Sequence, residues 1–144
     1  MFMKSLTLIF CLSVFYNSYC QEWIYDYNDA LNLASKSNKK IILVFQGSDW
    51  CAPCIKLEKD IWSSNEFIDY SNQNYIMLKA DFPRKKKNAL SLVQQEKNNR
   101  MAELYNKNGY FPFVVVINSK GLVLGESGYK KIVPSKYIQL IESF

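Results

Sequence analysis

Two cysteines separated by two residues are the strongest chemical signal in this sequence of 144 residues. Cys51 and Cys54 follow a continuous apolar run at residues 41–45 and precede a stretch with a helical pattern. A thiol is nucleophilic only as a thiolate, and free cysteine is mostly protonated near neutral pH. The unpaired N–H groups and the positive dipole end of a helix's first turn stabilise such an anion. The spacing therefore predicts an attacking thiol at Cys51 and a resolving thiol one turn later at Cys54.

The pair is predicted to be redox-active rather than structural. Cysteines three positions apart close almost no loop, so a disulfide between them adds little entropic stability. A structural zinc site needs four ligands, and the sequence has no His and only two further cysteines, Cys11 and Cys20. We therefore expect no metal site and no cofactor within one chain. A metal shared across a dimer, or Cu(I) held by the two thiolates, stays open as an alternative.

The first twenty residues have the pattern of a secretory signal peptide. Lys4 supplies the positive start, and residues 6–16 form an apolar run too short to span a bilayer, which needs about 20 residues. Ser18 and Cys20 are small residues at the −3 and −1 positions of a cut before Gln21. Two alternatives stay open: a buried N-terminal element, and lipidation of Cys20 as the mature N-terminus.

Cleavage at that point would leave one domain at 21–144, exported to the periplasm. An exported protein meets an oxidising compartment, in which a cysteine pair can cycle between dithiol and disulfide. About half of the residues are hydrophobic (49%), so the chain can build a real core. The net charge of +5 is modest and predicts no nucleic-acid partner. We expect a monomer.

The periodicity of apolar residues predicts the order β-α-β-α-β-α-β-β-α, which is typical of a mixed sheet with helices on both faces. The expected strands are 22–25, 40–45, 75–81, 113–117 and 122–125. The expected helices are 27–37, 51 to about 62, 65–72, 101–107 and 134–143. The stretch 83–99 is the least regular: it opens with the basic run 84–87 and then turns polar and helix-prone at 94–96. That run is interpreted as a solvated loop, with contact to an acidic partner as the alternative.

Several segments resemble the thioredoxin-like family. Residues 50–54, Trp-Cys-Ala-Pro-Cys, are similar to the Trp-Cys-Gly-Pro-Cys motif of thioredoxins. Residues 111–113, Phe-Pro-Phe, resemble the cis-proline segment that faces the cysteines, and 125–128 resemble the late glycine region. The agreement in element order runs from about 22 to 144. The segment 46–51 is most similar to exported thioredoxin-like proteins of Bacteroidetes-type bacteria.

This resemblance implies a thioredoxin-like α/β fold and thiol–disulfide exchange with client proteins. Catalysis would fall to Cys51 and Cys54, and the expected substrate-docking residues are Trp50, Pro53, Phe111 and Pro112. With Ala and Pro between the cysteines and no His there, the motif resembles the reducing type. An exported reductase would need a membrane thiol donor of the DsbD type. The alternatives are a thioredoxin-fold oxidase or isomerase, and a non-catalytic module that binds copper or a peptide.

The sequence also departs from the family pattern. Thioredoxins usually carry a buried Asp six residues before the first cysteine, where it helps to move protons, and this chain has Phe45 there. Asp49 is near but is expected to be exposed in the turn. Ala52 replaces the usual Gly, and 83–99 is longer than the minimal fold requires. The sequence therefore leaves the proton-transferring group unidentified.

Overall fold

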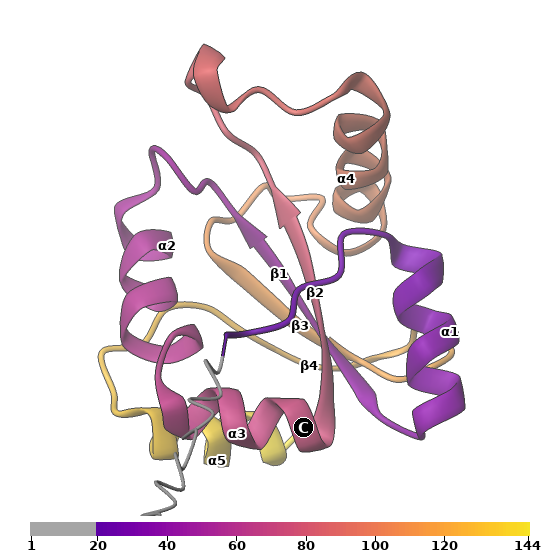
Figure 1. Ribbon diagram of the computed structural model, residues 1–144, viewed down its shortest axis with the longest axis vertical. Helices are drawn as coiled ribbons and strands as arrows, with labels where there is room; N and C mark the ends of the chain where they lie inside the picture. Colours follow the sequence, from indigo (N-terminus) through magenta and orange to yellow (C-terminus); the bar gives the residue numbers. More distant parts are fainter. Residues whose placement is uncertain (1–19) are drawn as a thin grey trace, which may run out of the picture.

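The computed structural model describes residues 20–144, which form a four-stranded sheet with helices on both faces (Figure 1). The strand order is β2-β1-β3-β4. Strand β1 pairs with β2 in parallel and with β3 antiparallel, and β4 is antiparallel to β3. The bounds are Lys40–Gln46 for β1, Tyr75–Asp81 for β2, Phe113–Ile117 for β3 and Val123–Ser127 for β4. The predicted mixed sheet is confirmed.

The helices form two groups, one against each face of the sheet. They are α1 (Tyr27–Ser37), α2 (Ala52–Leu57) continued by the π-helical turn η1 (Glu58–Trp62), α3 (Asn65–Asn74), the 3₁₀ turn η2 (Lys86–Asn88), α4 (Leu92–Tyr105) and α5 (Pro134–Glu142). Side chains of α2, η1, α3 and α5 share one core cluster with the sheet, and α1 and α4 share the other. One sheet covered by helices on both faces is the α/β layering that the sequence predicted.

Strand β1 is the centre of both core clusters. Successive side chains of a strand point to opposite faces, so Ile42 and Val44 pack toward α2 and α5 while Leu43 and Phe45 pack toward α1 and α4. All four are fully buried. Burial on both faces explains the continuous apolar run in the sequence. The cysteine motif begins where this most deeply held strand ends.

Most predicted bounds agree to within two residues, and the differences that matter concern the first strand, β4 and α4. The strand expected at 22–25 is reduced to one parallel bridge between Ile24 and Leu78. Strand β4 is Val123–Ser127 rather than 122–125. Helix α4 begins at Leu92, nine residues before the expected start, with its N-cap at Ser91. Only two of its residues are buried, so its first turns lack the apolar period on which the prediction depended.

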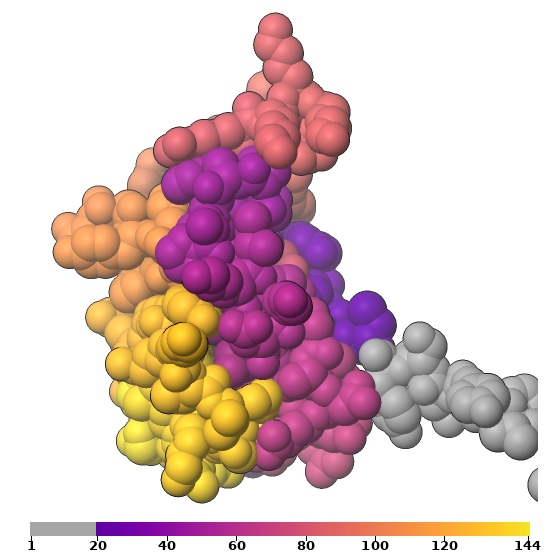
Figure 2. All heavy atoms as spheres, turned by 90° about the vertical axis from the view of Figure 1, so that its left-hand side faces the viewer, coloured from indigo at the N-terminus to yellow at the C-terminus, as the bar shows by residue number. Residues whose placement is uncertain are grey.

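Residues 1–19, and with them most of the predicted signal peptide, lie outside the described residues. Cys20 is described and has an exposed, free thiol. Within 20–144, no helix combines the length and apolarity that a membrane crossing requires. Figure 2 shows the side of the molecule on which the segment around 46–55 lies directly beneath the segment around 83–88.

Candidate active site

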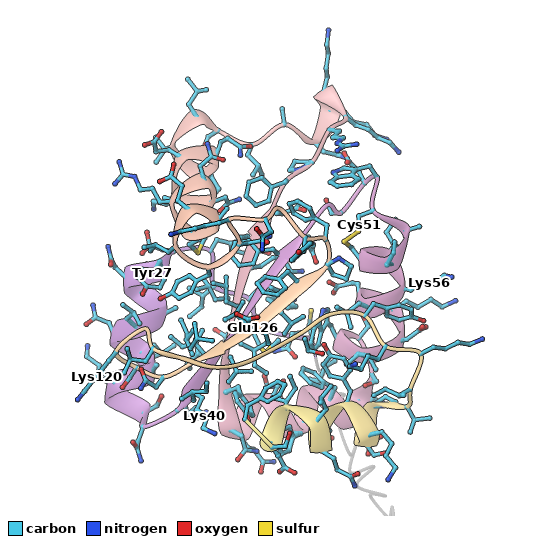
Figure 3. The ribbon with its side chains drawn as sticks, turned by 180° about the vertical axis from the view of Figure 1, so that it is seen from behind. Tyr27, Lys40, Cys51, Lys56, Lys120 and Glu126 are labelled. Carbon is cyan, nitrogen blue, oxygen red and sulfur yellow. A yellow bond between two sulfur atoms is a disulfide. The ribbon has the colours of Figure 1, made fainter. Side chains whose placement is uncertain are left out.

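Cys51 and Cys54 are joined by a disulfide at the start of α2, beyond the end of β1. Their sulfur atoms are 2.03 Å apart and their Cα atoms 5.2 Å. Figure 3 shows this bond close to the label of Cys51 at the end of the helix. The two residues are 4% and 2% exposed. The structure therefore brings the two predicted site cysteines together in the oxidised state.

Local backbone geometry places Cys51 at the N-cap of α2. Its N–H donates to the carbonyl oxygen of Gly47 (2.9 Å), and its own carbonyl accepts the first helical bond, from Ile55 (3.0 Å). The backbone N–H of Cys54 points at the Cys51 Sγ, 3.2 Å away. Pro53 lies in the first turn, where a missing N–H costs no helical bond. A negative charge on the Cys51 sulfur would therefore meet an aligned donor and the positive end of the helix.

An aromatic cluster made of Trp50, Phe82 and Phe111 lies beside the disulfide. The Trp50 Nε1–H donates to the carbonyl oxygen of Phe82 (2.7 Å), and the ring centroids of Trp50 and Phe111 are 5.4 Å apart in an edge arrangement. Phe82 contacts Phe111 in the same way, at 5.5 Å. A Cβ atom added at Gly47 would overlap the Trp50 indole. Gly47 therefore lets the indole approach the backbone of the turn closely.

Pro112 lies next to this cluster at the entry of β3. The Phe111–Pro112 peptide bond is cis, as the family resemblance implies. Phe113 is paired with Phe45, the penultimate residue of β1. Because β1 leads into the cysteine turn, this register brings Pro112 to the same end of the sheet. Sequence-distant residues Phe111 and Pro112 thus lie beside the motif at 50–54.

Phe45 occupies the position at which thioredoxins usually carry a buried Asp. Its ring is fully buried and stacks on that of Phe113, with 6.3 Å between the ring centroids. An ion pair that the sequence analysis missed lies near Cys54 instead. Glu58 follows Cys54 by four residues, hence on the same helix face, and its Oε2 is 3.1 Å from the Nζ of Lys79. The four-residue spacing between Cys54 and Glu58 was the sequence signal that could have identified Glu58. Both Cys54 and Glu58 line a cavity of about 350 Å³, together with Gln46, Ser48, Ile55, Lys59 and Ser63.

Lys79 is held firmly for a charged side chain. It lies on β2 and is 9% exposed. Its Nζ is 3.8 Å from the ring centroid of Trp23, a cation–π contact, in addition to the ion pair with Glu58. A buried cation is tolerated only with such partners. The pair places a carboxylate of defined position at the rim of the cavity beside Cys54.

The basic run is attached to the cysteine turn through Asp49. The Asp49 carboxylate accepts hydrogen bonds from the N–H of Arg84 (2.9 Å), the N–H of Lys85 (3.0 Å) and the Nδ2 of Asn88 (2.8 Å). These bonds lower the pKa of Asp49 below its ordinary value, and the bond from the Arg84 N–H has the largest effect. Asp49 is partly covered rather than exposed, because the segment 84–88 lies against it. The Arg84 guanidinium lies 3.6 Å from the ring centroid of Trp50.

Comparison with known proteins agrees with this geometry. A family model described as thioredoxin-like matches residues 22–119. The disulfide bond reductase DsbH of Chlamydia pneumoniae is 33% identical over 117 residues, which cover 81% of this chain and 69% of that protein. A solved DsbH oxidoreductase superposes with a TM-score of 0.80 at 29% identity, over 98% of this chain and 92% of that one. A thioredoxin from Thermus thermophilus shares the fold, with a TM-score of 0.63 at 14% identity over 85% of each chain. The Bacteroidetes-type origin stays a prediction.

Proposed function

The chain belongs to the thioredoxin-like family of thiol–disulfide oxidoreductases, and we propose that it is exported and acts chiefly as a reductase of protein disulfides. The observation that carries the proposal is the Cys51–Cys54 disulfide at the N-terminus of α2, with the Cys54 N–H directed at the Cys51 Sγ. Ala52 and Pro53 between the cysteines offer no imidazole that would hold a thiolate. Without that extra stabilisation the reduced form remains a ready electron donor.

Reduction of a client would take two exchange steps. The Cys51 thiolate attacks one client sulfur, the client S–S bond breaks, and its other sulfur leaves as a thiolate. Cys54 then loses its proton and attacks the Cys51 sulfur of the mixed disulfide, and the second client sulfur leaves. Two electrons pass to the client, the Cys54 proton ends on a released client thiolate, and the protein is left with the disulfide at Cys51 and Cys54.

The residues beside the disulfide would form the docking surface. Trp50 and Phe111 present an apolar wall, and Pro112 and Pro53 flank the bond without N–H groups of their own. A client segment bound there would lie against the Cys51 side of the pair. Reversal of the same steps would give oxidation or isomerisation, so the direction depends on the redox potential rather than on the atoms.

Export would place the protein among client proteins with disulfides, and it would also make an electron donor necessary. The apolar run at 6–16 and the small residues Ser18 and Cys20 support a signal peptide followed by a domain at 21–144 in the periplasm. Each turnover leaves the protein oxidised, so a membrane thiol donor of the DsbD type would restore the dithiol. Lipidation at Cys20 would instead tether the same domain to a membrane.

Insulin turnover tests the proposal directly. In the presence of dithiothreitol, the mature protein is expected to accelerate reduction of insulin disulfides, and Cys51→Ser to return the rate to that of dithiothreitol alone. The reduced protein titrated with Cu(I) supplies the contrast. Stoichiometric Cu(I) uptake without insulin turnover would replace the enzyme with a copper carrier.

A further inference from the structure

The positive charge of this protein is concentrated around its disulfide. The segments 48–60, 84–87 and 129–132 together hold eight Lys or Arg and three Asp or Glu. Their excess of five equals the net charge of +5 for the whole chain, since the rest carries ten residues of each sign. All eight cations are exposed, and we call them the basic surface: Lys56, Lys59, Arg84, Lys85, Lys86, Lys87, Lys130 and Lys131.

The three segments meet around the active site. Asp49 binds the backbone of Arg84 and Lys85, which fixes the second segment to the cysteine turn. The Tyr129 hydroxyl donates to Asp60 (3.1 Å), which joins the third segment to the helix that follows the cysteines. Figure 2 shows the three segments on one side of the molecule, with the cysteine segment between the other two.

The acidic side chains of this side are already engaged, whereas none of its eight cations is in an ion pair within residues 20–144. Asp49 is occupied by the backbone of 84–85 and Asn88, Glu58 by Lys79, and Asp60 by Tyr129. Among residues 20–144 the ion pairs involve Lys79, Lys97 and Arg100, none of which belongs to the basic surface. The surface therefore projects an uncompensated positive field beside the disulfide.

We propose that the basic surface selects client proteins that carry carboxylates close to the disulfide to be exchanged. The proposal rests on the thiol–disulfide exchange function. Arg84 lies on the ring of Trp50, the residue before Cys51, so the surface begins one side chain away from the attacking sulfur. An extended chain covers about 3.3 Å per residue, which puts client residues about three to six positions from the attacked cysteine within reach of 84–87.

The position of the surface favours a client over other anionic partners. A field centred on the disulfide raises the local concentration of whatever it attracts at Cys51 itself. Only a partner with a disulfide gains a reaction from that placement. A membrane or nucleic acid would be bound equally well by a basic surface anywhere else on the molecule.

Two matched peptides test the selection. Both contain one disulfide between a fluorophore and a quencher; one carries three Asp residues three to six positions from a cysteine, and the other carries Asn at those positions. The mature protein reduces each peptide in the presence of dithiothreitol, and the readout is the ratio of kcat/KM for the acidic peptide to that for the neutral one. The wild type is expected to give a ratio of about ten at low salt, falling toward one at high salt.

Two triple variants that lose the same number of positive charges test whether the preference for the acidic peptide depends on the basic segment. Lys85→Gln/Lys86→Gln/Lys87→Gln should lower the ratio at least about threefold, while the Asp49 clamp to the backbone remains. Lys36→Gln/Lys39→Gln/Lys120→Gln removes three lysines near the start of β1, at the end of the strand opposite the cysteine turn, and should keep the wild-type ratio. Figure 3 shows Lys120 on the far side of the molecule from Cys51.

Each remaining outcome overturns the proposal or its premise. A wild-type ratio near one, or an equal fall in both triple variants, would refute the selection while turnover of the neutral peptide kept the oxidoreductase intact. Failure of the wild type to reduce either peptide would refute the exchange function itself. Binding to phosphatidylglycerol vesicles that depends on Lys85–Lys87, with a peptide ratio near one, would assign the surface to a membrane instead.

Discussion

At the scale of single residues, the two cysteines differ in what surrounds each sulfur. Cys51 occupies the N-cap, where its sulfur receives the N–H of Cys54. Cys54 lies inside the first turn, is 2% exposed, and shares a cavity with Glu58. A negative charge on sulfur is therefore stabilised at Cys51, whereas Cys54 shares its cavity with the Glu58 carboxylate, which supports an attacker followed by a resolver.

The Cys54→Ser variant is expected to accumulate mixed disulfides with its clients. A serine hydroxyl cannot displace the client sulfur from Cys51 at neutral pH, so the first exchange step proceeds and the second stops. Mass spectrometry of client adducts without reductant measures the trapped species. The matched Cys51→Ser variant should form no adduct and keep the fold, because a disulfide of this short span contributes little stability. Turnover of Cys54→Ser at the wild-type rate would contradict the assigned roles.

Gly47 is expected to tolerate no side chain while Trp50 is in place. The Cβ of Gly47→Ala would overlap the indole, which cannot retreat freely because it donates to Phe82 and contacts Phe111. We expect a loss of about 1–3 kcal/mol in the free energy of unfolding, together with altered tryptophan emission. In the Trp50→Ala background the same substitution should cost far less. Equal denaturation midpoints for Gly47→Ala and the wild type would exclude the close approach.

At the scale of elements, the cysteine turn and the segment 84–88 form one unit. Their connection is the Asp49 carboxylate, whose partners lie 35 to 39 residues further along the chain. The Arg84–Trp50 contact adds a second link between them. The basic segment is therefore held in a defined place beside the active site.

Asp49→Ala should release that segment. With its acceptor lost, the N–H groups of Arg84 and Lys85 should exchange with solvent at least about tenfold faster, as NMR hydrogen exchange would measure. Asp69→Ala, on an exposed position of α3, removes the same charge and should leave both amides protected. Unchanged protection in Asp49→Ala would rule out the clamp.

The wild type should show the same release in acid. Hydrogen bonds lower the pKa of Asp49 below its ordinary value of 3.8. A depressed carboxylate pKa stabilises the fold fully above that ordinary value, and the contribution fades as pH falls through the lowered pKa. Protection of the two amides should therefore persist at pH values above about 4 and decline only below.

The sequence predicted the elements of the interior better than those of the surface. Strand β1 was recognisable because burial on both faces requires a continuous apolar run. Helix α4 was recognised only in its second half, because Leu92 and Val93 are 89% and 67% exposed while the polar Asn98 is buried. Its first turns depend on the Ser91 cap rather than on an apolar face.

The candidate site was likewise predictable only in part. The cysteine motif is local, and its chemistry can be read from its spacing. The ion pair of Glu58 with Lys79 joins residues 21 apart across η1 and β2, and the Asp49 clamp joins even more distant ones. Such contacts depend on how elements pack, which periodicity does not specify. The basic run could therefore be noticed in the sequence but not placed beside the disulfide.

At the scale of the whole molecule, Gln21 already packs against the folded domain. Its side chain is 8% exposed and accepts a hydrogen bond from the Ser71 hydroxyl (2.8 Å), whereas Cys20 is exposed. Mass spectrometry of the protein recovered from expressing cells should find Gln21 at the mature N-terminus, with or without cyclisation. A diacylglycerol mass on Cys20 would contradict this and make the protein a membrane-anchored lipoprotein.

The redox potential of the Cys51–Cys54 pair tests the central claim most directly. Equilibration of the mature protein with dithiothreitol or glutathione buffers, followed by alkylation, measures the fraction of dithiol at each ratio. The helix N-terminus and the Cys54 N–H stabilise the thiolate moderately, and no imidazole adds to them. A reductase should therefore have a potential nearer thioredoxin's, about −270 mV, than that of DsbA, about −120 mV. A value above about −150 mV, in the range of strong oxidants, would contradict the account and leave an oxidase in its place.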